Sequence, residues 1–125
     1  NKNFPVAVNF EIHYPNAKLV AEEVRKSGGK TFVAHVYRYN LEDEIAFLDM
    51  LRNDKIIDGV EVYHSKHDYD DEVKYLTMAK ERNLFVTGGS DYHGIPNRYP
   101  YHLGEYVVDS NLINQFIERI RCISA

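Results

Sequence analysis

The stretch Leu84-Phe85-Val86-Thr87-Gly88-Gly89-Ser90-Asp91-Tyr92-His93-Gly94 decides the fold of this chain. Its first three residues are apolar and include aromatic and β-branched side chains, a pattern that predicts a buried strand. The two glycines predict a sharp turn, and Asp91 and His93 follow it. A carboxylate oxygen beside an imidazole nitrogen suits Zn, Mn or Fe. The alternative is a Gly-Gly turn followed by an Asx-turn, with His93 merely exposed.

Composition describes an ordinary globular protein of one domain. The chain has 125 residues, of which 44% are hydrophobic and 27% are charged. The net charge is −4, from 15 Lys and Arg against 19 Asp and Glu, and neither sign forms a long block. A protein that binds nucleic acid without regard to sequence needs a basic face, so this balance argues against that class.

Cysteine content and the chain's ends bear on the compartment. Cys122 is the single cysteine, which excludes an internal disulfide and fits a reducing compartment. It lies among isoleucines in a predicted terminal helix, so we expect its side chain to be a packing residue. The sequence shows no signal peptide and no apolar run near 18 residues, and we expect a cytoplasmic protein. The chain opens on Asn1 rather than Met, which predicts that its natural start is missing.

Strand and helix patterns alternate along the chain. Alternating apolar residues predict an opening strand over Phe4–Phe10, which Pro5 restricts to an edge or a strand start. Four helices are predicted, and Ser110 is expected to cap the last, with its leucine, isoleucines and phenylalanine buried. The other predicted elements are a helix capped by Asn16 and closed by Ser27-Gly28-Gly29, a strand over 30–36, a helix capped by Asn40, strands over 60–64 and 84–86, a helix over 71–82, and a strand over 105–108.

Alternation of this kind predicts an α/β fold with parallel strands joined by right-handed crossovers. In such folds the ligand site lies beyond the carboxyl ends of the strands. The interior strands of this chain end at His35, at Tyr63-His64, and before Asp91 and His93. All the candidate ligands therefore fall at strand ends, and this coincidence favours a metal site over an exposed turn.

Other residues allow more than one interpretation. His64 and His67, with Asp68, form either a second metal cluster or a solvated loop. Glu61 is either an exposed carboxylate or a group inside the fold, and Arg38 is either a clamp for an anionic oxygen or a surface residue. The Gly-x-Ser-x-Gly elbow, the Gly-x-x-x-x-Gly-Lys-Ser/Thr loop and the Gly-x-Gly-x-x-Gly turn are absent from the sequence, so the nucleophiles and nucleotide sites built on them are unsupported.

Three segments resemble those of the polymerase and histidinol phosphatase (PHP) family. Residues 28–39 (GGKTFVAHVYRY) are similar to its GG-x-x-x-x-AHP-x-RY segment, residues 59–67 (GVEVYHSKH) to its G-[IV]-E-V strand, and residues 84–94 to its GSD-x-H motif. They come in the order and at the spacing of the family, over about residues 16 to 110. The subgroup most similar to this chain is that of the stand-alone PHP phosphoesterases.

The resemblance implies a distorted β/α barrel with divalent metal ions at the strand carboxyl ends. His35, Asp91 and His93 match metal ligands of the family, and Arg38 and His67 match positions that contact the substrate phosphate in similar stand-alone members. The implied activity is metal-dependent hydrolysis of a phosphate ester, such as a nucleotide or a small phosphorylated metabolite.

The chain departs from the family in two respects. Val36 stands where the family usually has proline, and the opening His-x-His motif of the family would lie upstream of Asn1. We therefore expect residues 1–125 to be the C-terminal part of a PHP-type barrel, inactive alone. The alternative is a non-catalytic half-barrel that binds a partner or metal. In either case the free sheet edge is expected to pair with the missing half or with a second copy.

Overall fold

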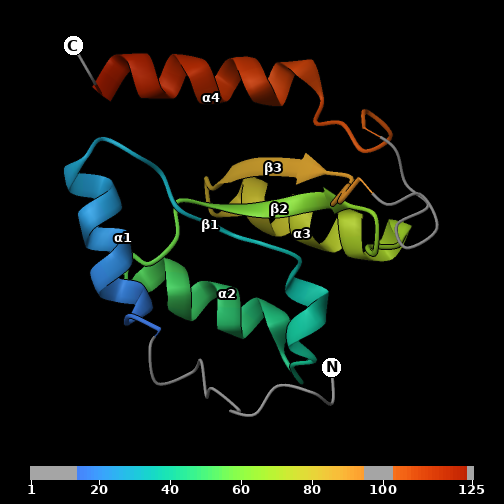
Figure 1. Cartoon of the computed structure of the whole chain (residues 1–125), viewed down its shortest axis with the longest axis horizontal. Coiled ribbons are helices and arrows are strands. Elements are labelled where there is room, and N and C mark those ends of the chain that lie inside the picture. Colours follow the sequence, from blue (N-terminus) through green and yellow to red (C-terminus); the bar gives the residue numbers. More distant parts are fainter. Residues whose placement is uncertain (1–13, 95–102, 124–125) are drawn as a thin grey trace.

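The computed structural model describes residues 14–94 and 103–123, and it confirms an α/β fold in which helices alternate with parallel strands (Figure 1). The predicted strand over 4–10 lies outside the described residues. In chain order the elements are α1 (Ala17–Lys26), β1 (Phe32–Val33), a 3-10 helix (Val36–Tyr39), α2 (Glu44–Asn53), β2 (Gly59–His64), α3 (Tyr69–Glu81), β3 (Phe85–Gly89) and α4 (Ser110–Ile123).

The sheet has three strands in the order β1-β2-β3, and both pairings are parallel. Strand β2 is therefore central, and its carboxyl end lies between those of β1 and β3. Helix α3 packs on β2, and α4 lies beside β3 on the side of the sheet away from α2 (Figure 1). Because the three strands are parallel, the loops that follow β1, β2 and β3 all begin at the same edge of the sheet.

A β-bulge interrupts the pairing of β2 with β3. Glu61 pairs with Thr87 and Tyr63 with Gly88, so Val62 has no partner in the register. The bulge brings the two backbones unusually close, because a Cβ atom on Gly88 would lie 2.6 Å from the Tyr63 Cβ atom and 2.7 Å from its carbonyl oxygen. Only glycine fits this position of β3 without displacing β2.

The core lies between the sheet and the two helices α2 and α3. Leu48 of α2 and Tyr75 of α3 are fully buried against Val60 and Val62 of β2. Val36, which replaces the proline of the family pattern, is also fully buried and belongs to this core. The whole cluster of buried residues is Val33, Val36, Leu48, Ile57, Val60, Val62, Tyr75, Met78 and Ala79.

Helix ends follow local capping chemistry. The Asn16 side chain accepts a hydrogen bond from the Lys18 N–H, as predicted, and α1 ends at Ser27 and Gly28, whose φ is +81°. The prediction for α2 was wrong by several residues. Its cap is Asp43, whose carboxylate accepts from the Ala46 N–H, because Asn40 adopts the left-handed conformation that ends the preceding 3-10 helix.

Two predicted strands differ from the structure. Strand β1 covers two residues instead of 30–36, because His35 adopts a left-handed conformation and a 3-10 helix starts directly after it. Residues 105–108 form bends and irregular backbone, so the strand predicted there is wrong. A pattern of alternating side chains does not show whether a neighbouring strand is present to complete the ladder.

The prediction that α4 buries its apolar residues is correct for only one side of the helix. The Phe116 ring packs edge-on against Phe85, with ring centroids 4.7 Å apart. Ile113 and Ile117 are 45% and 39% exposed, and Cys122 is exposed rather than packed. The helix turns only one narrow stripe toward the sheet, so its other apolar residues stay at the surface. Within the described part of the chain, no helix has the length and apolar character needed to cross a membrane.

Candidate metal centre

The carboxyl ends of the three strands bring three predicted or suspected ligands to one edge of the sheet. His35 follows β1, His64 ends β2, and Asp91 follows β3. Because β2 is central, His64 lies between the other two. Its ring centroid is 5.8 Å from that of His35, and its Nε2 atom is 4.0 Å from Asp91 Oδ2.

Two of these residues have an uncommon backbone conformation. His35 has a φ of +35° and Asp91 a φ of +56°, both in the left-handed region, which Asp tolerates better than most residues other than glycine and which is less common for His. Such conformations cost about 1–3 kcal/mol and cluster at binding and catalytic sites. The sharp turn predicted at Gly88 and Gly89 is wrong, because both glycines belong to β3 and neither has a positive φ.

Glu61 holds the His35 backbone in this conformation. One of its carboxylate oxygens accepts a hydrogen bond of 2.6 Å from the His35 N–H. Of the two interpretations left open by the sequence, the half-buried position and this bond favour a role inside the fold. The role of Glu61 could not be found from its alternation with Val60 and Val62 alone, because that pattern indicates only a face of the strand.

Asp91 and His93 approach each other closely. The His93 Nε2 atom lies 3.0 Å from Asp91 Oδ1, and their side chains are 51% and 34% exposed. Two ligands of one ion held at bonds of about 2.0–2.2 Å lie roughly 3 Å apart, so these atoms are close enough to share a metal ion. The pair opens to solvent on one side and contacts the buried His64 on the other.

His67 is a buried histidine with one ring nitrogen fixed and one available. Its Nδ1 atom lies 2.7 Å from the Val62 carbonyl oxygen, which can only accept, so Nδ1 carries a proton and donates it. The ring packs on Tyr75 and edge-on against Tyr37, with centroids 5.0 and 5.4 Å away. Its Nε2 atom is the one that a ligand could reach.

Arg38 and Asp68 are not brought into this cluster. Arg38 lies exposed on the 3-10 helix after His35 and makes no ion pair with the described residues. Asp68 caps α3 by accepting a hydrogen bond from the Asp71 N–H at 2.9 Å. The proposed second cluster of His64, His67 and Asp68 is therefore not formed as a unit, although the two imidazole rings lie 5.4 Å apart.

The electrostatic surroundings keep His64 neutral. Burial lowers the pKa of its imidazole, and the neighbouring His67 and His35 rings lower the pKa further. The carboxylates of Glu61 and Asp91 act in the opposite direction, and burial is the larger effect. A neutral imidazole has one protonated and one unprotonated nitrogen, so its hydrogen bonds decide which atom is the donor.

Three buried nitrogen atoms of this cluster have no hydrogen-bond partner among the described residues. They are His35 Nδ1, His64 Nε2 and His67 Nε2. Buried polar atoms are nearly always paired in proteins, so three such atoms at one edge of a sheet indicate that partners of this cluster are missing. The nitrogen and carboxylate donors match a divalent metal in chemical type. Among residues 14–94 and 103–123, however, no three such side chains are placed to hold one ion.

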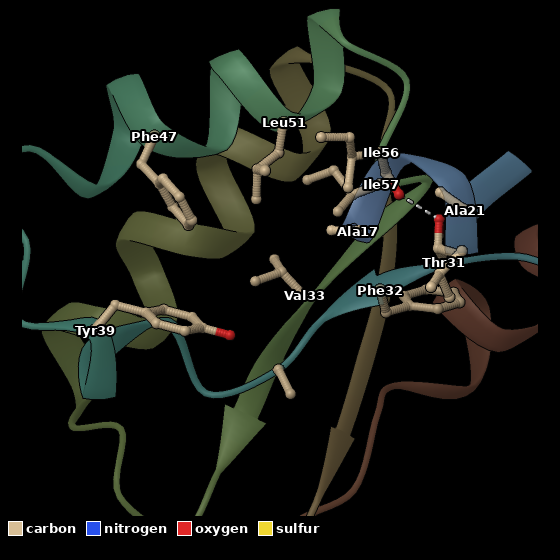
Figure 2. A pocket seen from close by; sticks show the side chains of 12 residues that line it. Ala17, Ala21, Thr31, Phe32, Val33, Tyr39, Phe47, Leu51, Ile56 and Ile57 are labelled. Carbon is tan, nitrogen blue, oxygen red and sulfur yellow. Dashed lines mark hydrogen bonds between the residues drawn. The ribbon is translucent and has the colours of Figure 1, made fainter. Parts of the chain in front are cut away.

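A separate apolar pocket lies between α1, α2 and β1 (Figure 2). It has a volume of about 430 Å³, and the Phe47, Leu51, Val33 and Tyr39 side chains line it. The hydrogen bond drawn there joins the Thr31 hydroxyl to the Ile56 carbonyl at 2.6 Å. With no carboxylate, imidazole or cation in its lining, the pocket does not suit a phosphate or a metal ion.

Comparison with known proteins supports the resemblance found in the sequence. No protein-family model matches the chain. The chain is 31% identical over 94 residues to a phosphoribosyl 1,2-cyclic phosphate 1,2-diphosphodiesterase of Eggerthella lenta, a match that covers 75% of this chain and 34% of that protein. It also matches the crystal structure of a protein described as a candidate metal-dependent phosphoesterase of Bifidobacterium adolescentis, with a TM-score of 0.66 and 34% identity.

The structural match covers 84% of this chain and 37% of that one, so the chain spans about a third of each relative. Both relatives are named as phosphoesterases, as the sequence motifs predicted, and the α/β fold is shared. The resemblance to metal-dependent phosphoesterases is thereby confirmed for this part of the fold.

Proposed function

We propose that this chain supplies part of the active site of a metal-dependent phosphoesterase of the PHP type. The observation that carries the proposal is the meeting of His35, His64 and Asp91 at the carboxyl ends of three parallel strands, with buried nitrogen atoms left unpaired. The named activities of both relatives support it.

In this proposal His35, Asp91 and His93 contribute ligands to divalent metal, with Mn, Zn and Fe as the candidates. Among the described residues they are not placed around one ion, so the proposal requires further ligands from outside residues 1–125. The metal would polarise the phosphoryl group and activate water for hydrolysis. Arg38, although exposed in this conformation, is within the loop that follows His35 and would bind a phosphate oxygen through its guanidinium. His67 would contact the phosphate through Nε2, which requires a second proton on its ring because Nδ1 already donates to Val62.

We propose further that residues 1–125 form the C-terminal part of a larger barrel and that the metal shell needs ligands from outside the chain. Three side chains close only part of the shell of a divalent ion. The share of each relative that the chain spans, 34% and 37%, agrees with this. A phosphate ester is the proposed substrate class, because the first relative is named for a cyclic phosphate and the second for phosphoesters in general.

A second candidate is a non-catalytic half-barrel that docks on a partner. The observation that favours it is the apolar pocket of Figure 2 beside the edge strand β1. On the adjoining helix α1, Leu19 and Val20 are 60% and 41% exposed. Such a surface suits the missing half of a barrel or a second copy of the chain. The free sheet edge is expected to make the chain self-associate in sedimentation. A stable compact monomer would overturn that expectation and would favour a stand-alone module over a truncated enzyme.

Metal binding is the first test of the proposed function. Calorimetric titration of the chain with Zn²⁺ and Mn²⁺ is expected to show weak binding, because the shell is incomplete. His35→Ala, Asp91→Ala and His93→Ala should each weaken it at least about tenfold. Asp54→Ala changes an exposed carboxylate at the end of α2 and serves as the control. Two or more tightly held ions per chain would contradict the assignment of ligands.

Catalysis is tested separately. Hydrolysis of bis-p-nitrophenyl phosphate and p-nitrophenyl phosphate, with Mn²⁺ or Zn²⁺ present, should be absent or very slow for the chain alone. The intact gene product, identified by its mass, should hydrolyse one of them if a His-x-His strand precedes Asn1. Absence of such a strand from the intact product would favour the non-catalytic module.

A further inference from the structure

A buried histidine that no resemblance assigns occupies the middle of the candidate centre. His64 is 2% exposed and ends the central strand, between His35 and Asp91. Its position alone allows two roles: a further metal ligand, or a group that orients a ligand. The hydrogen bond to its other ring nitrogen distinguishes them.

The Nδ1 atom of His64 accepts a hydrogen bond of 3.1 Å from the backbone N–H of Lys66. A backbone N–H can only donate, so Nδ1 carries no proton in this arrangement. A neutral imidazole then carries its proton on Nε2. His64 therefore presents an N–H group, not a lone pair, toward the candidate centre.

His67 has the opposite arrangement. Its Nδ1–H donates to the Val62 carbonyl, so its Nε2 atom presents a lone pair. Two neighbouring histidines, 5.4 Å apart between ring centroids, are thus fixed by backbone groups in opposite tautomers. A metal ion accepts the lone pair of a neutral imidazole and cannot bind at a protonated nitrogen. This excludes the Nε2 atom of His64 as a ligand in this tautomer.

A carboxylate oxygen lies near the His64 Nε2 atom. Asp91 Oδ2 lies 4.0 Å away, about 1 Å beyond hydrogen-bond length, and Nε2 has no other hydrogen-bond partner among the described residues. The other oxygen of Asp91, Oδ1, faces His93. A rotation of the Asp91 side chain would bring Oδ2 within hydrogen-bond distance of His64 Nε2, while Oδ1 would remain on the side of His93.

We propose that His64 is a positioning residue that donates its Nε2–H to Asp91 Oδ2 and thereby fixes the carboxylate with Oδ1 directed toward His93, where a metal ion would bind. Groups that hydrogen-bond to metal ligands orient them, and removing such groups typically weakens metal affinity about 10–100-fold. The part that concerns metal rests on the proposed function. The tautomer and the hydrogen bond do not.

Nitrogen-15 NMR on the metal-free protein tests the hydrogen bond directly. Long-range proton–nitrogen spectra should show His64 protonated at Nε2 and unprotonated at Nδ1, and His67 with the reverse pattern. Asp91→Ala should shift the His64 Nε2–H proton resonance, and Asp54→Ala should leave it in place. A proton on Nδ1 of His64, or no shift with Asp91→Ala, would overturn the proposal.

Two variants of His64 test its effect on Zn²⁺ binding. In His64→Gln the side-chain amide places a donor near the original Nε2 position, and affinity should stay within about threefold of wild type, whereas His64→Leu should lose about 10–100-fold. Equal losses in both variants would indicate a direct ligand, and no loss in His64→Leu would indicate a packing role only. Each of these outcomes overturns the proposal. If the wild-type protein binds no Zn²⁺, the proposed function fails, while the NMR result still decides the role of His64.

Discussion

One carboxylate oxygen of Glu61 accepts a 2.6 Å hydrogen bond from the backbone N–H of His35. The bond crosses from the central strand to the loop after the edge strand, and it ties down a residue whose φ is +35°. A carboxylate acceptor makes such a bond stronger than a neutral one would. Glu61 thus stabilises the backbone on which a candidate ligand is presented.

Replacing Glu61 by alanine should therefore release the His35 backbone. We expect Glu61→Ala to weaken Zn²⁺ affinity about 10–100-fold, while Glu61→Gln, which keeps an oxygen acceptor, retains most of it. Glu42→Ala removes an exposed glutamate outside the cluster and is the control. Titration calorimetry measures all three. Unchanged affinity in Glu61→Ala would show that the left-handed conformation of His35 does not depend on this bond.

The two adjacent glycines of β3 should respond differently to alanine. A Cβ atom at Gly88 would come within 2.6 Å of Tyr63, whereas one at Gly89 would meet nothing within 4 Å. Neither glycine has a positive φ, so space alone separates them. We expect Gly88→Ala to lower the free energy of unfolding by about 1–3 kcal/mol through overpacking, and Gly89→Ala to change it by less than about 1 kcal/mol. Urea denaturation measures both, and equal effects would contradict the close approach at the bulge.

The hydroxyl of Tyr75 should contribute to the packing of α3 against α2. It donates a 2.7 Å hydrogen bond to Glu44, whose carboxylate also pairs with Lys74 at 2.6 Å. Burial, together with the bond to Glu44, raises the pKa of the Tyr75 phenol above its ordinary value. We expect Tyr75→Phe to destabilise the protein by about 1–2 kcal/mol. Tyr69→Phe alters a ring that is 77% exposed and should have no measurable effect on thermal unfolding.

The ion pair between Asp49 and Arg82 should make stability depend on pH. The Arg82 guanidinium donates hydrogen bonds to both carboxylate oxygens and holds the pKa of Asp49 below its ordinary value. Because the pKa is lower in the folded state, the stabilisation is present above about pH 4 and is lost as the pH falls through the lowered value.

Asp49→Asn should therefore lower the urea midpoint at about pH 7 and have a smaller effect at acidic pH below the lowered pKa, where the wild-type carboxylate is protonated. Glu118→Gln, on an exposed position of α4, controls for the loss of one negative charge. A shift of the same size at both pH values would show that the charge of Asp49 does not carry the interaction.

Local patterns in the sequence were enough to predict the class of fold and the edge of the sheet where the site lies. Alternating strand and helix patterns imply parallel strands, and a parallel sheet places the loops after its strands at one edge, so the sequence alone predicts that His35 and Asp91 lie at the same edge. The boundaries were less accurate. The short length of β1 and the absence of a strand at 105–108 depend on which neighbours pair, which local alternation does not encode.

The tertiary structure alone decided how that edge is built. His64 stands at its centre because β2 is the middle strand, and the order of strands is a property of the sheet rather than of any segment. The need for glycine at position 88 arises from a bulge that pairs two residues of β2 with one of β3. Likewise, the tautomers of His64 and His67 are set by the backbone groups that their rings meet. The sequence determines which side chains reach this edge, whereas contacts between distant segments determine which atom each one presents.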